Sequence, residues 1–203
     1  MITTGNQGCP ADTDVLQLTI LQQPQAAISG LQDVCLNSQE SYSTIAGSGY
    51  SYQWNVIGGS IVSGTQENIT VEWNAVGTGT ISLLVHDNNG CDSATTMNVE
   101  VHPLPVPAVA GPVSVCTDAQ IDFSVSPEAG NSYAWNVTNG TIVSGSATNA
   151  VSVALSGSGS ATLNVAQTNS FGCVTDASLA IDLIQRPAPV VSGDTAVCIQ
   201  TIS

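Results

Sequence analysis

The chain has 203 residues and carries one arginine, no lysine and fifteen carboxylates, for a formal net charge of -14 at pH 7. This balance argues against nucleic acid as a partner, because phosphate contacts need clustered cations. It also argues against binding to an anionic membrane surface. No apolar run reaches the roughly 18 residues that would span a bilayer. We therefore expect neither a nucleic acid partner nor membrane insertion.

Composition indicates a folded chain that is rich in strands. Apolar residues make up 42% of the chain and charged residues 8%, with 19 glycines and 9 prolines. This mixture is too apolar for a disordered chain. Valine, isoleucine and threonine favour strands, whereas glycine, proline and asparagine favour short turns.

Two types of cysteine alternate along the chain with a fixed period. One type follows valine, the other follows glycine, and each recurs every 81 or 82 residues. Such a period is typical of a tandem array. The valine type comprises Cys35, Cys116 and Cys198, and the glycine type comprises Cys9, Cys91 and Cys173.

The period divides the chain into four parts. We expect residues 1–21 to be the C-terminal part of a preceding repeat, and residues 22–103 and 104–185 to be two complete modules. Residues 186–203 then form the N-terminal part of a following repeat. Proline-led segments separate these parts, and proline stiffens a linker and cannot continue a central strand. The chain is thus expected to be a slice of a longer array.

Short runs of β-branched and aromatic residues lie inside each module. Glycine-rich turns separate these runs, so that about seven short strands fit into one module. In chain order the clearest runs are YQWNV (52–56), ITVEW (69–73), ISLLV (81–85), IDFSV (121–125) and ATLNVAQ (161–167). The predicted fold class is all-β, with tandem antiparallel β-sandwich modules.

The three tryptophans are expected to differ in exposure. Trp54 and Trp135 each lie in the middle of a strand, and we expect both in the core, because buried aromatic residues dominate small cores. Trp73 is expected to be more exposed, because the corresponding strand of the second module, VSVAL (151–155), has no aromatic residue. An exposed tryptophan would offer a platform on which a sugar could stack.

One phrase occurs twice, as YQWNVIGGSIVSG at 52–64 and as YAWNVTNGTIVSG at 133–145. Together with the linker proline, the VC and GC cysteines and a GTGT strand, it resembles the PKD-like repeats of large secreted Bacteroidota surface proteins. The resemblance implies an immunoglobulin-like β-sandwich and an extracellular or cell-surface location. Better-known PKD domains carry WDFGDG where this chain has WNVIGG and WNVTNG, so no role of those aspartates is carried over.

Disulfide bonds are expected, because recurring cysteines in an extracellular chain usually pair. Two connectivities respect the repeat. In the preferred one, Cys35 pairs with Cys91 and Cys116 pairs with Cys173, since closing such long loops stabilises a small module by about 4 kcal/mol. Cys9 and Cys198 then pair outside the slice. In the alternative, successive modules are joined by Cys9 with Cys35, Cys91 with Cys116, and Cys173 with Cys198.

The two histidines give little support for catalysis. His86 lies beside Asp87, but the second module has VAQTNSFGC in place of this segment, without a histidine. An active site carried by the repeat is therefore not expected, because a hydrolytic site needs a histidine with its nucleophile and orienting partner. His102 precedes a linker proline and is expected to be solvated. We expect no catalytic residues and no enzyme activity.

No cofactor is expected, and calcium is the one metal that the carboxylates suggest. Asp87, Asn88, Asn89 and Asp92 resemble an oxygen-rich calcium loop, although formation of a turn by Asn89 and Gly90 explains the same residues. Further carboxylates near the linkers follow no repeated pattern; these are Asp33, Glu100 and Asp182.

Two triplets are candidates for O-glycosylation. Asp92-Ser93-Ala94 and Asp194-Thr195-Ala196 match the D-S/T-A sites at which Bacteroidota modify exported proteins. The candidate acceptors are Ser93 and Thr195.

Two functions remain open. The first is a non-catalytic structural segment of an extracellular stalk, adhesin or filament, in which the modules act as disulfide-hardened spacers and contact neighbouring copies or repeats of the same protein. The second is a module that binds a glycan or protein ligand, within a secreted adhesin or a polysaccharide-degrading enzyme. The lack of an aromatic counterpart for Trp73 favours the spacer.

Overall fold

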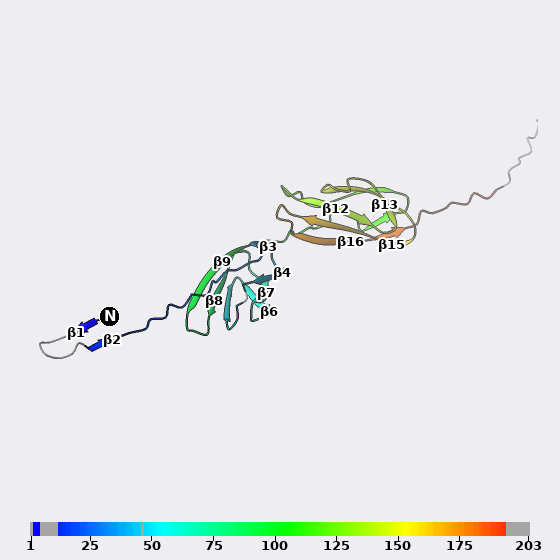
Figure 1. Cartoon of the computed structure of the whole chain (residues 1–203). Helices are drawn as coiled ribbons and strands as arrows, with labels where there is room; N and C mark the ends of the chain where they lie inside the picture. Colours follow the sequence, from blue (N-terminus) through cyan, green and yellow to red (C-terminus); the bar gives the residue numbers. More distant parts are fainter. Residues whose placement is uncertain (1, 5–11, 46, 194–203) are drawn as a thin grey trace, which may run out of the picture. The chain divides into compact units, whose positions relative to one another are not determined.

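The computed structural model describes residues 2–4, 12–45 and 47–193. It divides into two compact units, Met1–Pro103 and Leu104–Ser203. Each unit contains one β-sandwich, and Figure 1 shows that strands make up both of them. No helix occurs in the described part of the chain, and the predicted all-β fold of tandem sandwich modules is confirmed. A short hairpin lies near the N-terminus, with strands β1 (Ile2–Thr4) and β2 (Asp12–Asp14).

The first module consists of a four-stranded sheet and a three-stranded sheet, in the orders β3-β9-β8-β5 and β4-β7-β6. The bounds of the first sheet are β3 (Asp33–Cys35), β9 (Asp92–His102), β8 (Gly77–His86) and β5 (Ser51–Ile57). Those of the second sheet are β4 (Gln39–Ser43), β7 (Asn68–Trp73) and β6 (Gly59–Ser63).

The second module has the same topology, with sheets in the orders β10-β16-β15-β12 and β11-β14-β13. The bounds of its first sheet are β10 (Ser114–Cys116), β16 (Val174–Ile184), β15 (Gly159–Thr168) and β12 (Ser132–Val137). Those of its second sheet are β11 (Gln120–Ser124), β14 (Ala150–Leu155) and β13 (Gly140–Ser144).

The first short strand of each four-stranded sheet runs parallel to the last strand of the same module. In the first module Asp33 pairs with Glu100 and Cys35 with His102. In the second, Cys116 pairs with Ile184 at the end of β16. All other strand pairs in the two modules are antiparallel.

The residues that lead into β3 follow the same direction along β9. The Gln23 side chain donates a hydrogen bond to the Asp92 carbonyl, at the start of β9. Three residues later, the Ala26 amide lies 3.4 Å from Ser93 Oγ. The chain therefore enters the module beside the start of β9 and leaves it at the end of β9. We call these two ends the entry pole and the exit pole, and name the corresponding ends of β16 in the same way.

The repeated phrase passes from one sheet to the other. In the first module it comprises β5, Gly58 and β6, which belong to different sheets. Gly58 has φ +86°, and Asn139, its counterpart in the second module, has φ +53°. Both lie in the left-handed region, where glycine and asparagine are favoured. The predicted strand-turn-strand arrangement thus connects the two layers of the sandwich.

Trp54 and Trp135 occupy equivalent places against the core. Trp135 is buried, and Trp54 is half-buried and packs on the core cluster of its module. Each indole N–H donates a hydrogen bond to a loop carbonyl, from Trp54 to Gln66 at 2.7 Å and from Trp135 to Thr148 at 2.8 Å. The tryptophan of the repeated phrase therefore holds the loop that precedes β7 in the first module and β14 in the second.

Trp73 is buried, so the prediction that it is more exposed is wrong. Its exposed fraction is 0%, because it lies on the inward face of β7 with Ile69 and Val71. Its indole N–H donates to the Tyr42 hydroxyl at 3.1 Å, and the two rings meet edge to face with centroids 6.1 Å apart. The Tyr42 hydroxyl in turn donates to the Leu31 carbonyl at 3.0 Å.

The glycines that recur before the valine-type cysteines make room for an aromatic ring. A Cβ atom on Gly30 would lie 2.2 Å from the Tyr42 ring, and one on Gly111 would lie 2.2 Å from the Phe123 ring. Tyr42 and Phe123 are themselves equivalent core residues, each 1% exposed. The period of the glycines is therefore a consequence of core packing.

Candidate functional site

The described cysteines lie at the poles of the sandwiches. Those that follow valine, Cys35 and Cys116, end β3 and β10 at the exit poles. Those that follow glycine, Cys91 and Cys173, directly precede β9 and β16 at the entry poles. Cys35 and Cys173 are each disulfide-bonded, whereas Cys91 and Cys116 carry free thiols. One member of each type is therefore bonded and one is free.

The preferred pairing of Cys35 with Cys91 and of Cys116 with Cys173 is wrong, because Cys91 and Cys116 are free. The geometry of the last strand explains why. Cys35 lies beside His102 at the end of β9, and Cys91 lies before its start, so the 11 residues of β9 separate them. At a rise of about 3.3 Å per residue this is roughly 36 Å, whereas a disulfide needs Cα atoms within about 7 Å.

The alternative bond between Cys91 and Cys116 is absent for the same reason, since both thiols are free. Two cysteines lie outside the described residues, namely Cys9 and Cys198. Their expected pairing stays a prediction.

A tight turn holds the glycine-type cysteine in both modules. In the first, Asp87 Oδ1 accepts hydrogen bonds from the backbone N–H of Asn89 and of Cys91, both at 2.8 Å. In the second, Asn169 Oδ1 accepts the equivalent bonds from Phe171 and Cys173, both at 3.0 Å. The hydrogen bond from the Cys91 amide is the main cause that lowers the pKa of Asp87.

This turn accounts for the residues that resembled a calcium loop, because the Asp87 carboxylate is engaged by backbone amides. Within the described ranges, no group of three or more histidine, cysteine, aspartate or glutamate side chains is placed to hold a metal ion. Asp33 lies 2.9 Å from His102, Glu100 accepts a hydrogen bond from Thr78, and Asp182 pairs with Ser114 through the backbone.

The histidines lie apart and each contacts one aspartate. His86 Nδ1 lies 2.6 Å from Asp92 Oδ1. His86 is the last residue of β8 and pairs with Asp92, the first residue of β9, at the entry pole. His102 Nε2 lies 2.9 Å from Asp33 Oδ1. His102 is the last residue of β9 and is only 8% exposed, so the prediction of a solvated linker residue is wrong.

Of the two candidate glycosylation sites, only Ser93 lies in the described part of the chain. Ser93 is half-buried on β9, and its hydroxyl oxygen faces the Ala26 amide. Thr195 lies outside the described residues.

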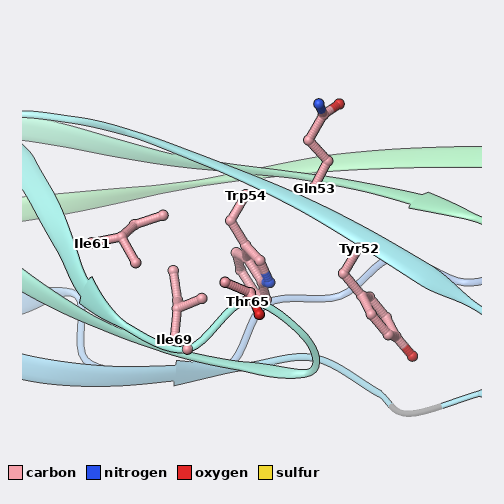
Figure 2. A pocket seen from close by; sticks show the side chains of 7 residues that line it. Tyr52, Gln53, Trp54, Ile61, Thr65 and Ile69 are labelled. Atoms are coloured by element: carbon pink, nitrogen blue, oxygen red, sulfur yellow. The ribbon is translucent and has the colours of Figure 1, made fainter.

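A small cavity lies beside Trp54 in the first module. Its volume is about 230 Å³, which is below the about 300 to 1,000 Å³ of common ligand pockets. Figure 2 shows the Trp54 ring between Tyr52 and the isoleucines, with Gln53 on the other side of the strand. The lining is mostly apolar and comprises Tyr52, Gln53, Trp54, Ile61, Gly64, Thr65 and Ile69.

Comparison with solved structures shows sandwich proteins of low sequence identity. Bacteroides ovatus SGBP-B, of a mixed-linkage glucan utilization locus and in complex with a mixed-linkage heptasaccharide, is 14% identical with a TM-score of 0.32. The alignment covers 83% of this chain and 46% of that one, so this chain spans less than half of its length. Fibronectin(III)-like modules of Clostridium thermocellum CbhA are 14% identical with a TM-score of 0.39, covering 78% of this chain and 95% of that one.

A third structure is the C-terminal fragment of intimin in complex with the intimin-binding domain of its translocated receptor. It is 11% identical with a TM-score of 0.41, and the alignment covers 80% of this chain and 66% of that one. No curated protein matches the sequence. In the described part of the chain, no helix is long and apolar enough to cross a membrane.

The sequence matches the family model of the PKD-like domain twice in tandem, at residues 21–101 and 102–181. These two matches cover more than half of the chain and follow the two sandwiches described above. The chain therefore belongs to the PKD-like domain family.

Proposed function

We propose that the chain is a non-catalytic, load-bearing spacer segment of an extracellular stalk, adhesin or filament. The observation that carries the proposal is the parallel pairing of the first and last strands in both modules, β3 with β9 and β10 with β16. Because the chain enters at one pole and leaves at the other, tension applied through the chain acts along these paired strands. The hydrogen bonds of each pair are then loaded together, in shear.

The length of the last strand supports the same role. β9 and β16 each have 11 residues, and each pairs with its antiparallel neighbour through ten residue pairs. The last strand therefore lies between the short first strand and a long partner, and it spans the module from pole to pole. A strand in that place transmits force through many backbone hydrogen bonds at once.

The cysteine chemistry supports an extracellular place of action. Disulfide bonds persist in oxidising compartments and are rare in the cytosol, and Cys35 and Cys173 are disulfide-bonded here. The chain has no lysine, and its one arginine, Arg186, is followed by Pro187, so trypsin-like proteases have no efficient site in it. Both features suit a protein that is exposed outside the cell.

A non-catalytic role is supported by the two different surroundings of the histidines. His86 pairs with Asp92 on the outer end of a hairpin, and the second module has Thr168 at the equivalent place. His102 joins β9 to Asp33 beside the parallel pair. Both contacts serve to hold strand ends together.

Force spectroscopy of the intact chain tests the proposal. Under reducing conditions, we expect two unfolding events, each releasing about 80 residues or roughly 27 nm of extended chain. Both events should need forces well above those of sandwiches whose terminal strands are antiparallel. Unfolding of both modules at the low forces of unzipped hairpins would contradict a load-bearing role.

The cavity beside Trp54 favours a second candidate function, binding of a glycan. The apolar ring of Trp54 and the polar side chain of Thr65 combine the two kinds of contact that a sugar needs. Isothermal titration calorimetry of the chain with soluble glycans tests this candidate; a Thr65→Trp variant, which fills the cavity, should abolish any binding.

A further inference from the structure

The free thiols of Cys91 and Cys116 are of opposite types and lie at opposite kinds of pole. Cys91 precedes β9 at the entry pole of the first module, and Cys116 ends β10 at the exit pole of the second. In chain order, neither pole borders the linker between the two modules. Cys91 is half-buried and Cys116 is exposed, so both thiols are within reach of another molecule.

The equivalent residues of the other module show what these positions do. Cys173 occupies the place of Cys91, in the same turn and with the same hydrogen bond from its amide to the residue four positions earlier. Cys35 occupies the place of Cys116, at the end of the parallel strand. Both Cys173 and Cys35 are disulfide-bonded. The surroundings of each type of cysteine are therefore compatible with a bond to another cysteine.

We propose that Cys116 of one copy forms a disulfide with Cys91 of the next, so that copies of this chain join head to tail. This inference deepens the proposed spacer function and rests on it, because it identifies a second copy as the covalent partner. Pairing an exit pole with an entry pole is a heterologous contact, which repeats in one direction without closing. Such a contact extends an array, whereas a bond between two cysteines of one type stops at a dimer.

The reaction needs an external disulfide as oxidant. The thiolate of Cys116 attacks a low-molecular-weight disulfide and releases one thiol, leaving a mixed disulfide on Cys116. The thiolate of Cys91 from the second copy then attacks the Cys116 sulfur and releases the second thiol. One external disulfide is reduced to two thiols, and two protein thiols are oxidised to one Sγ–Sγ bond.

Two single variants test the direction of the bond. Cys91→Ser keeps only the exit-pole thiol of the pair, and Cys116→Ser keeps only the entry-pole thiol. The whole chain and each variant are incubated in a glutathione redox buffer and separated on a non-reducing gel. We expect the unaltered chain to form a ladder, each variant alone to lose it, and a mixture of the two variants to form a dimer.

Mass spectrometry identifies the bond in each band. Chymotrypsin is the suitable protease, since the one arginine precedes a proline and leaves trypsin no efficient site in the chain. A peptide joining Cys91 to Cys116, formed between isotope-labelled and unlabelled copies, is the expected product. A dimer of Cys91→Ser alone through two Cys116 residues, or a monomeric mixture, would overturn the proposal.

The unaltered chain gives a second measurement in case a variant fails to fold, because its ladder must contain the same joined peptide. Failure of this proposal is distinguishable from failure of the spacer function. A chain that unfolds at high force but forms no ladder is a spacer without this crosslink. A chain that forms the ladder but unfolds at low force is crosslinked without being load-bearing.

Discussion

The two modules share one topology but fill the same part of the core in different ways. The first uses Tyr42, Trp73 and Gly79; the second uses Phe123, Leu155 and Ala161 at the equivalent places. In the first module the large Trp73 side chain packs against Gly79. In the second module the smaller Leu155 shares the core with Ala161. The volumes change together, as close packing requires.

The hydrogen bonding of these residues changes together as well. Tyr42 supplies the hydroxyl that accepts the Trp73 indole N–H at 3.1 Å. Burial raises the pKa of the Tyr42 hydroxyl, which keeps it protonated as the donor to Leu31. In the second module neither Phe123 nor Leu155 has a polar side chain to satisfy. All three residues differ between the two modules, but the differences compensate one another in volume and in hydrogen bonding. We infer that the three positions vary together.

The largest effect that separates the modules should come from Gly79. A Cβ atom there would lie 2.3 Å from Trp73 and 2.9 Å from the Ile57 carbonyl. Gly79→Ala should lower the free energy of unfolding of the first module by about 1 to 3 kcal/mol, measured by urea unfolding with tryptophan fluorescence.

The same substitution should cost much less in a Trp73→Leu background, because that pair reproduces Leu155 with Ala161. The interaction free energy from this double-mutant cycle is the quantity that tests coupling. Equal costs of Gly79→Ala in the two backgrounds would show that the three residues vary independently.

The next effect concerns the hydroxyl of Tyr42. Tyr42→Phe leaves the buried Trp73 indole N–H without its acceptor and should cost about 1 to 2 kcal/mol. The matched control is the same change in the Trp73→Leu background, where no indole remains and the cost should nearly vanish. A large cost in both backgrounds would assign the effect to the Tyr42 bond with Leu31 instead.

The smallest effect concerns the turns that hold the glycine-type cysteines. The pKa of Asp87 is lowered in the folded state, so its ionised form adds stability above its unfolded pKa of about 3.9. That contribution is lost as the pH falls through the folded pKa. Asp87→Asn, which copies Asn169, should make the melting temperature of the first module less sensitive to acid.

The reciprocal change gives the control for this comparison. Asn169→Asp should make the second module more sensitive to acid, measured by calorimetry between about pH 6 and about pH 3. An unchanged acid sensitivity in both variants would mean that the carboxylate is not what stabilises the turn.

The fold was predictable from the sequence, because each level of pattern indicated the same structure. Alternating apolar residues indicated strands, glycines indicated turns, and the 81- to 82-residue period indicated tandem modules. The core position of Trp135 followed from its place in the middle of a strand. The recurring glycines at Gly30 and Gly111 were visible as a pattern, but their cause was not, since the rings that cover them lie 12 residues further on.

The burial of Trp73 was missed although a signal for it was present. Ile69, Val71 and Trp73 alternate with polar residues, so a period of two places all three on one face. Comparison with the second module misled, because Leu155 fills the equivalent place without being aromatic. The alternation of residues within the strand predicted the burial of Trp73 better than the residue type at the equivalent position of the second module did.

The disulfide pairing was mispredicted because chain entropy was considered without strand geometry. A long loop between two cysteines makes a bond favourable in the unfolded chain, but an extended strand between them holds their Cα atoms apart in the folded one. Recognition that the segment after Cys91 is a single strand would have placed it and Cys35 at opposite poles.

The direction of pulling gives the most direct test of the load-bearing role. The first module is stretched through handles at Gln23 and Pro103, which load β3 and β9 along their length. It is then stretched through Gln39 and Pro103, which both lie near the exit pole. A clearly higher unfolding force in the first direction is expected, since the bonds then break together. Equal forces in both directions would contradict the claim that the parallel pair carries the load.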